Sequence, residues 1–304
     1  MRILAPQQAI KLSVGAALAT MAIKVAAWGL TGSVGFLSDA LESSVNLAGA
    51  LFALWMLRWA HEPADEQHPF GHGKAEYFSA IFEAGLISLA ALAIIGAAGE
   101  RLLHPRPIES LGLGTVFAVI ASAVNLATAR VLFASGRAHR SMALDADARH
   151  LMTDVWTTAG VIAGVGLAWA TGWNWLDPLV AIAVALNILR EGWRLIRASI
   201  DGLMDRALGD EEIARIEAVL HSYAARGVGF ENLRTRRAGA QRFANVDLRV
   251  PGDWTVTRAH DVADEIERAV GLAVAGVLLE THVEPHGVKH ARRDDPHGPP
   301  PPLG

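Results

Sequence analysis

The stretch that decides the fold is GFLSDALESSVNLAGALFALWML, residues 35–57, an apolar run that nevertheless carries Asp39, Glu42 and Asn46. A bilayer core requires about 20 mostly apolar residues per helix. An ionisable side chain at that depth is costly, and it usually faces a partner or a water-filled cavity. The stretch therefore predicts a membrane-spanning helix with a polar site on one face.

The composition of the whole chain agrees with a membrane part followed by a soluble part. Apolar residues make up 52% of the 304 residues, and the mean hydropathy is +0.28. The apolar runs are concentrated in residues 9–200, whereas residues 205–304 resemble an ordinary soluble sequence. A net charge of −4 gives no reason to expect a nucleic-acid partner. The absence of cysteine excludes disulfides and thiolate metal sites.

Apolar stretches of bilayer length predict six transmembrane helices in an α-helical membrane protein. They cover residues 9–31, 35–58, 78–103, 111–134, 146–171 and 177–198. The N-terminal stretch is interpreted as a first span and not as a removed signal peptide. The segments after the second, fourth and sixth spans hold more Lys and Arg residues than the connections on the opposite side, which predicts both termini on the cytoplasmic side of the inner membrane.

The sequence after residue 205 predicts a small cytoplasmic α+β domain. Residues 209–225 have the pattern of an amphipathic helix, and two short alternating runs around Gly239 have the pattern of paired strands. A second helix opens at Thr255 or Thr257, and GVLLETHVEP forms a third strand. The predicted domains are residues 1–204 in the membrane, residues 205–286 in a metal-binding domain, and residues 287–304 in a disordered tail rich in Pro and His.

Two predicted spans each present a polar pair four residues apart. Glu42 and Asn46 share one face of the second span, and His150 and Asp154 share one face of the fifth. Together they supply four ligands for one ion, of the oxygen and imidazole types that suit zinc, iron, manganese or cobalt. Asp39, one turn before Glu42, is a candidate alternate ligand, or it caps the helix or lines water.

A structural alternative exists for each of these pairs. Glu42 could pair with Lys24, and His150 with Asp154 could form a polar cluster at a helix start. The matched spacing on two helices favours a metal site over two separate polar clusters.

Two further groups of metal-ligand residue types lie outside the spans. The loop after the second span, HEPADEQHPFGHGKAE, holds Asp65, His68 and His72, and its Pro and Gly residues prevent a regular helix. The alternative is a solvated loop that happens to be rich in His. In the C-terminal domain, His282 and Glu284 share a strand face. The full candidate set there is Glu231, Asp247, His260, His282 and Glu284, and a solvated acidic surface is the alternative.

These motifs, in this order along about residues 9–286, resemble the cation diffusion facilitator family of bacterial divalent metal cation/proton antiporters. The matching stretches are SDALESSVN, EPADEQHPFGHGKAE, HLMTDV, LMDRAL, LRTRRAG and THVEP. The resemblance implies six transmembrane helices, a cytoplasmic αββαβ domain and a homodimer in the lipid membrane. It also implies a transport site at Glu42, Asn46, His150 and Asp154, a loop site, a C-terminal site, and an ion pair between Lys74 and Asp205.

The chain departs from the family pattern at positions that bear on the metal. Asn46 stands where Asp is common, and Glu42 stands where Asp or His is common. Glu231 and Asp247 stand where imidazoles are common. The resulting oxygen-rich sites leave zinc, iron, manganese, cobalt and nickel open as the metal that is both substrate and regulator.

The function implied by the resemblance is proton-coupled efflux of a divalent transition metal cation by alternating access. The alternative is a membrane-bound metal-sensing or scaffold protein that does not transport. An enzyme is not expected, because the sequence contains no HExxH motif and no Ser-based motif.

Overall fold

The computed structural model describes residues 3–31, 34–104, 113–173 and 175–287. The side chains of residues 27–42 lie outside what it describes. The predicted disordered tail also lies outside it from residue 288 onward. The chain divides into two compact units, and the first comprises the residues up to Asp205 together with Ala238–Ala240.

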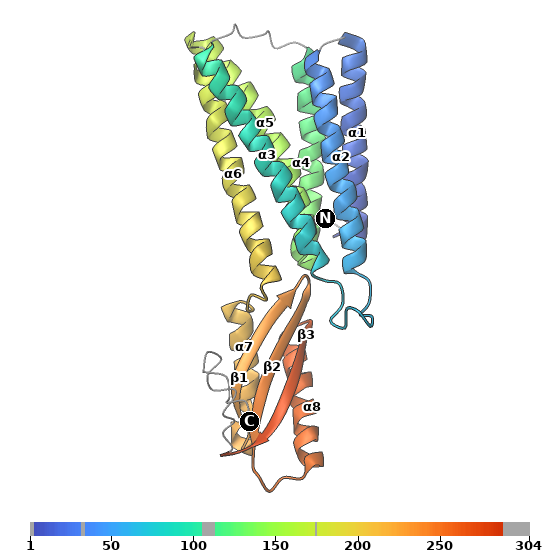
Figure 1. Ribbon diagram of the computed structural model, residues 1–304, viewed down its shortest axis with the longest axis vertical. Coiled ribbons are helices and arrows are strands. Elements are labelled where there is room, and N and C mark those ends of the chain that lie inside the picture. Colours follow the sequence, from blue (N-terminus) through green and yellow to red (C-terminus); the bar gives the residue numbers. More distant parts are fainter. Residues whose placement is uncertain (1–2, 32–33, 105–112, 174, 288–304) are drawn as a thin grey trace, which may run out of the picture. The chain divides into compact units, whose positions relative to one another are not determined.

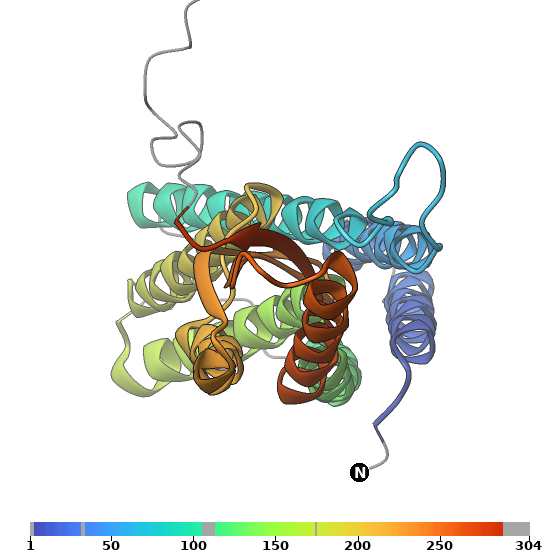
Figure 2. The same cartoon turned by 90° about the horizontal axis from the view of Figure 1, so that it is seen from below.

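The first unit is built from the six predicted long helices, as the described residues show (Figure 1). They are α1 (Pro6–Thr31), α2 (Val34–Ala60), α3 (Ala75–Leu103), α4 (Leu113–His139), α5 (Met142–Thr171) and α6 (Leu176–Leu203). Helices α4 and α6 continue past the predicted apolar stretches, which ended at residues 134 and 198, because polar residues extend each helix beyond the bilayer core. Seen along their length, α1 and α2 lie on one side of the bundle and α6 on the opposite side (Figure 2).

Small residues form much of the contact between these helices. Ala53, Ala129, Ala143 and Ala148 are fully buried in one cluster that joins α1, α2, α4 and α5. Ala84 and Ala146 are fully buried in a second cluster, which joins α3, α5 and α6. Small side chains let helix backbones approach closely, which is how helices associate where lipid removes the hydrophobic drive.

Large apolar side chains point away from this bundle. Leu89, Leu92 and Leu186 are each more than half exposed. Within the described residues, three stretches are long and apolar enough on their own to cross a membrane, namely Pro6–Ala26, Ala75–Leu103 and Val116–His139. An apolar exterior over buried polar groups is the arrangement that a lipid environment requires.

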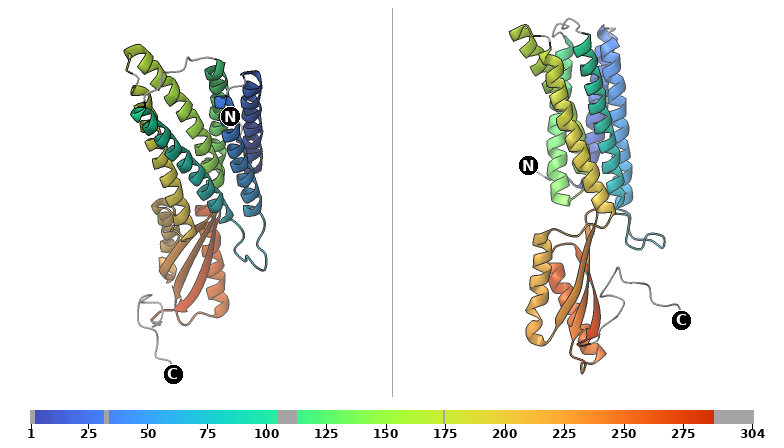
Figure 3. Two further views of the ribbon diagram at one scale, coloured as in Figure 1. Left: turned by 45° about the horizontal axis from the view of Figure 1, so that its top comes forward. Right: turned by 60° about the vertical axis from the view of Figure 1, so that its left-hand side comes forward.

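The second unit is a three-stranded sheet with two helices on one face (Figure 3). Its elements are α7 (Asp210–Ser222), β1 (Gly229–Ala238), β2 (Gln241–Val250), α8 (Val256–Ala273) and β3 (Val277–Pro285). This order confirms the predicted αββαβ domain. The strand order is β1-β2-β3, and β2 and β3 run parallel, with α8 as the crossover between them.

Alternation along the strands decides which face is covered. Val246 and Leu248 of β2 pack with Ile216 of α7 and Ile266 of α8 in one core. The hydroxyl of Thr255 accepts the backbone N–H of Arg258 at 3.2 Å, so Thr255 is the N-cap of α8. The residues that alternate with these apolar ones, including Asp247, face the opposite side of the sheet.

Candidate metal centres

Helices α2 and α5 bring Asn46, His150 and Asp154 together. The side-chain amide of Asn46 donates to Asp154 Oδ2 at 2.8 Å, and its Oδ1 lies 3.0 Å from His150 Nε2. His150 is 6% exposed and lies more than two turns inside α5. The two polar groups of α5 are therefore not a cluster at a helix start. They face a polar residue of another helix inside the bundle.

The structure adds Asn125 of α4 to this group. Its side-chain amide donates to the same Asp154 Oδ2 at 3.0 Å, and the residue is 5% exposed. The sequence prediction missed Asn125. The available signal was a single amide within the apolar run of α4.

Glu83 of α3 is a second residue that the sequence prediction missed. Its Oε2 lies 3.3 Å from His150 Nδ1, and the residue is fully buried. A carboxylate inside the apolar run of α3, away from both ends of the helix, was the signal that could have found it. The polar group thus draws on four helices, α2, α3, α4 and α5.

Two residues predicted for this site lie outside the described side chains. They are Asp39 and Glu42, whose positions belong to the backbone of α2. Their place among the ligands, and the pairing of Glu42 with Lys24, remain predictions.

The loop between α2 and α3 gathers its three predicted ligands. Asp65, His68 and His72 offer ligand atoms that all lie within 4.8 Å of one another. His72 Nε2 is 3.0 Å from His68 Nδ1 and 3.4 Å from Asp65 Oδ2. Within the described residues, this is the group of His and carboxylate side chains that already has the spacing of a metal site.

Hydrogen bonds hold Asp65 in its ionised form. The backbone N–H of His68 donates to Asp65 Oδ1 at 2.6 Å, and that of Gln67 donates at 2.9 Å. The His68 bond is the main cause that lowers the pKa of Asp65 from its ordinary value. A metal ligand must be deprotonated, so this loop keeps its carboxylate ready to bind.

Trp59 and His61, at the end of α2, lie next to the loop group in the sequence. The ring of Trp59 lies 5.8 Å from that of His72 and 6.3 Å from that of His68, between ring centroids. The Nδ1 of His61 lies 2.7 Å from the carbonyl oxygen of Leu57, at the end of α2. His61 therefore caps the helix.

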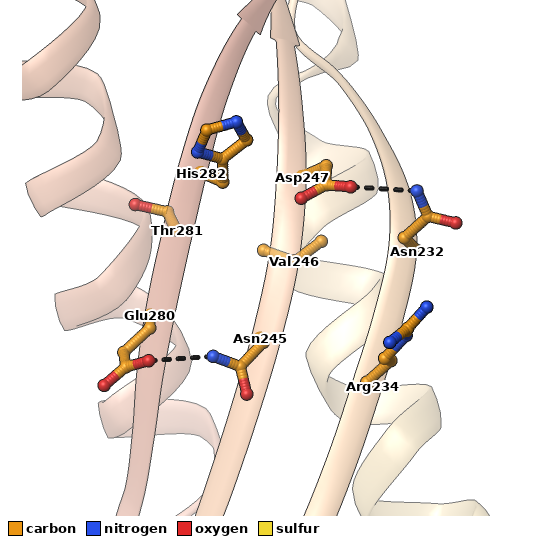
Figure 4. A pocket seen from close by; sticks show the side chains of 8 residues that line it. All are labelled: Asn232, Arg234, Asn245, Val246, Asp247, Glu280, Thr281 and His282. Atoms are coloured by element: carbon orange, nitrogen blue, oxygen red, sulfur yellow. Dashed lines mark hydrogen bonds between the residues drawn. The ribbon is translucent and has the colours of Figure 1, made fainter. Parts of the chain in front are cut away.

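On the open face of the sheet, Asp247 and His282 are direct neighbours on β2 and β3. They line a pocket of about 330 Å³, and Asn232 donates to Asp247 Oδ2 at 2.8 Å (Figure 4). Two residues earlier on both strands, at the bottom of the same figure, Asn245 donates to Glu280 Oε2 at 2.8 Å. The pocket is thus lined by carboxylates, amides and one imidazole, together with the guanidinium of Arg234.

Arg249 neutralises the remaining carboxylates of this face. Its guanidinium lies 3.1 Å from Glu231 Oε2 and 2.7 Å from Glu284 Oε2, and Glu284 Oε1 lies 3.1 Å from His282 Nε2. The hydrogen bond to Glu231 raises the pKa of Arg249. The last predicted member, His260, is an exposed residue of α8 and lies 3.7 Å from Asp264. It does not line the pocket.

Lys74 and Asp205 form an ion pair between the start of α3 and the chain just after α6. The Lys74 Nζ lies 2.8 Å from Asp205 Oδ1, and it also donates to the backbone carbonyl of Leu203 at 3.3 Å. Both side chains are partly exposed, so the pair is expected to contribute little to stability.

Two family models match this chain. The cation efflux transmembrane domain covers residues 10–204, and the cation efflux protein cytoplasmic domain covers residues 208–286. The chain belongs to the cation efflux family. The predicted resemblance is confirmed, and the protein is a membrane transporter and not an enzyme.

Curated relatives of this cation efflux protein extend over most of both chains. An uncharacterized transporter of Synechocystis sp. is 49% identical over 274 residues, which are 90% of this chain and 88% of the relative. The cation-efflux pump FieF of Klebsiella pneumoniae is 34% identical over 273 residues, 90% of each chain. The FieF of Citrobacter koseri is 34% identical over 286 residues, 94% of each chain.

Proposed function

We propose that this cation efflux protein exports a divalent transition metal cation across the cytoplasmic membrane in exchange for protons. The observation that carries the proposal is the polar group between α2 and α5, where the side chain of Asn46 lies within hydrogen-bond distance of both His150 and Asp154. Polar groups are placed in a lipid-embedded bundle at a cost, and an ion pathway is the usual reason.

The ligand chemistry favours a transition metal as the substrate. One imidazole nitrogen, one carboxylate and one amide oxygen are available from the described side chains, and Glu42 and Asp39 are proposed to complete the set. Imidazole with oxygen ligands suits zinc, iron, manganese, cobalt or nickel. The relatives named as cation-efflux pumps support efflux as the direction.

Proton exchange follows from the requirements of the ligands. His150 must be deprotonated to bind the ion, and its side chain type titrates within the physiological range. A more acidic exterior would then displace the ion after the site opens outward. Rocking of helices around a fixed central site would switch the access.

The other two groups are proposed as regulatory sites. Asp65, His68 and His72 would bind a metal ion on the loop. Glu231, Asp247, His260, His282 and Glu284 would bind metal in the domain of residues 205–286 and hold two such domains together in a homodimer. The distribution of Lys and Arg supports cytoplasmic termini.

The test is metal flux into proteoliposomes, measured with zinc, iron, manganese and cobalt, with and without a pH gradient. We expect flux of at least one of these ions, and faster flux when the interior of the proteoliposomes is acidic. We expect Asp154→Ala to abolish the flux. Flux of Asp154→Ala at the native rate would contradict the proposed site. A wild type that binds metal without flux would instead indicate a sensor or scaffold.

A further inference from the structure

Glu83 is a buried carboxylate that the proposed transport cycle does not use. It is 0% exposed on α3, and apart from the close approach of His150 neither of its oxygens has a hydrogen-bond partner among the residues that the structure describes. A buried polar group without a partner is costly, and a buried carboxylate is more so. Such a residue in a helix bundle requires a compensating role.

The nearest polar neighbour of Glu83 is the ring of His150. Glu83 Oε2 lies 3.3 Å from Nδ1, on the side of the ring opposite the transport group. The other nitrogen, Nε2, lies 3.0 Å from Oδ1 of Asn46. The imidazole is therefore held between a carboxylate of α3 and an amide of α2.

Helix α2 leaves room for this carboxylate at one position. A Cβ atom added to Gly49 would lie 3.0 Å from Glu83 Oε1 and 3.4 Å from Oε2. Gly49 stands three residues after Asn46, so both face the same side of α2. The same helix face thus contacts the imidazole through Asn46 and makes space for Glu83 through Gly49.

We propose that Glu83 is a positioning residue for the transport site: its carboxylate accepts the Nδ1–H of His150 and keeps Nε2 directed at the ion. A histidine that binds a metal through one nitrogen usually donates the other N–H to a carboxylate or carbonyl, which fixes the tautomer and the ring orientation. This inference rests on the proposed transport site between α2 and α5.

The first test compares Glu83→Leu and Glu83→Gln in the flux assay. Loss of such a partner typically reduces metal affinity about 10- to 100-fold, so Glu83→Leu should raise the KM for the metal by that order. The maximal rate should fall much less. Glu83→Gln retains an acceptor oxygen of the same shape, so its KM should lie between those of the wild type and Glu83→Leu.

Glu76→Gln is the matched control. Glu76 is another buried carboxylate of α3, seven residues earlier, but it accepts the hydroxyl of Ser141 at 2.6 Å and the backbone N–H of Ala143 at 3.3 Å. It supports the start of α5 without contacting His150. We expect a lower melting temperature for this variant and an unchanged KM.

Gly49→Ala provides a second route that leaves every charge in place. The added methyl group should displace the Glu83 carboxylate and raise the KM in the same direction as Glu83→Leu, even where Glu83→Leu itself fails to fold. An unchanged KM in Glu83→Gln and Gly49→Ala, together with an unchanged KM in a folded Glu83→Leu, would overturn the positioning role. Loss of flux in Asp154→Ala would in that case leave the proposed transport site standing, whereas full flux in Asp154→Ala would remove both.

Discussion

The membrane-embedded site and the open face of the sheet use the same interaction in two different media. Asn125 donates to Asp154 inside the helix bundle, and Asn245 donates to Glu280 on the exposed sheet surface. In the bundle, lipid and packed helices supply no replacement partner, whereas water can replace either partner on the sheet. Loss of the same kind of hydrogen bond should therefore affect transport much more in the bundle than on the sheet.

The two regions also differ in the cost of admitting a cation. On the sheet, Glu284 already binds Arg249 at 2.7 Å, so a metal ion that uses Glu284 must displace a guanidinium or share the carboxylate with it. This competition favours weaker, adjustable binding there. Differential occupancy of such a site can bias a conformational equilibrium, which suits a regulatory role.

The largest expected contrast comes from matched Asn→Leu substitutions. Asn125→Leu leaves the partly buried Asp154 carboxylate without one of its two amide donors, which costs about 1–3 kcal/mol. We expect the metal concentration for half-maximal flux to rise on the order of 10-fold or more. Asn245→Leu on the exposed face should change it by less than about 2-fold. Equal effects of the two variants would contradict the expected difference between the bundle and the sheet.

The loop group should show an intermediate effect with a direct optical signal. The ring of Trp59 lies 5.8 Å from that of His72, so metal binding to the loop should alter the fluorescence of Trp59. His72→Ala should abolish this response and lower flux at limiting metal several-fold. Trp59→Phe assigns the signal, and His61→Ala, which alters a helix cap, should retain it.

A fluorescence response that persists in His72→Ala with the same metal dependence would contradict this prediction. It would show that the metal ion near Trp59 does not bind through His72.

The C-terminal face should produce a smaller shift that leaves the maximal rate intact. The double variant Glu231→Ala, His282→Ala removes one carboxylate and one imidazole from this face. We expect a rise of a few-fold in the metal concentration for half-maximal flux, measured over a full titration. Asp210→Ala, which removes an exposed carboxylate of α7, is the control. An unchanged concentration in the double variant would argue against regulation from this face.

The smallest effect is expected at the partly exposed ion pair of Lys74 and Asp205. A surface pair of this kind contributes about 0–1 kcal/mol. A double-mutant cycle of Lys74→Ala and Asp205→Ala, read from thermal unfolding in detergent, should give a coupling energy within that range. A coupling of several kcal/mol would show that the pair contributes as much as a buried contact.

Much of the architecture could be predicted from local pattern. Apolar stretches of bilayer length gave the six helices, and alternation with turn residues gave the three strands. The Thr255 cap was one of two candidates, and the structure selects it. Such features depend on neighbours within a few residues, so the sequence displays them directly.

The partners of single polar residues could not be predicted in the same way. Spacing pairs His150 with Asp154 on one helix, but it does not say which face of α3 or α4 packs against them. Asn125 and Glu83 therefore stood as isolated polar residues in apolar runs. On the sheet, alternation placed Glu284 on the correct face. It did not indicate that Arg249 would form an ion pair with Glu284.

The most direct measurement is the location of a bound ion, by anomalous diffraction from crystals of the full chain saturated with zinc or cobalt. If α2 and α5 bind the substrate, an anomalous peak should lie about 2.0–2.2 Å from His150 Nε2 and from a carboxylate oxygen of Asp154. Peaks confined to the loop and the sheet face at saturating metal, with none between α2 and α5, would contradict the transport site.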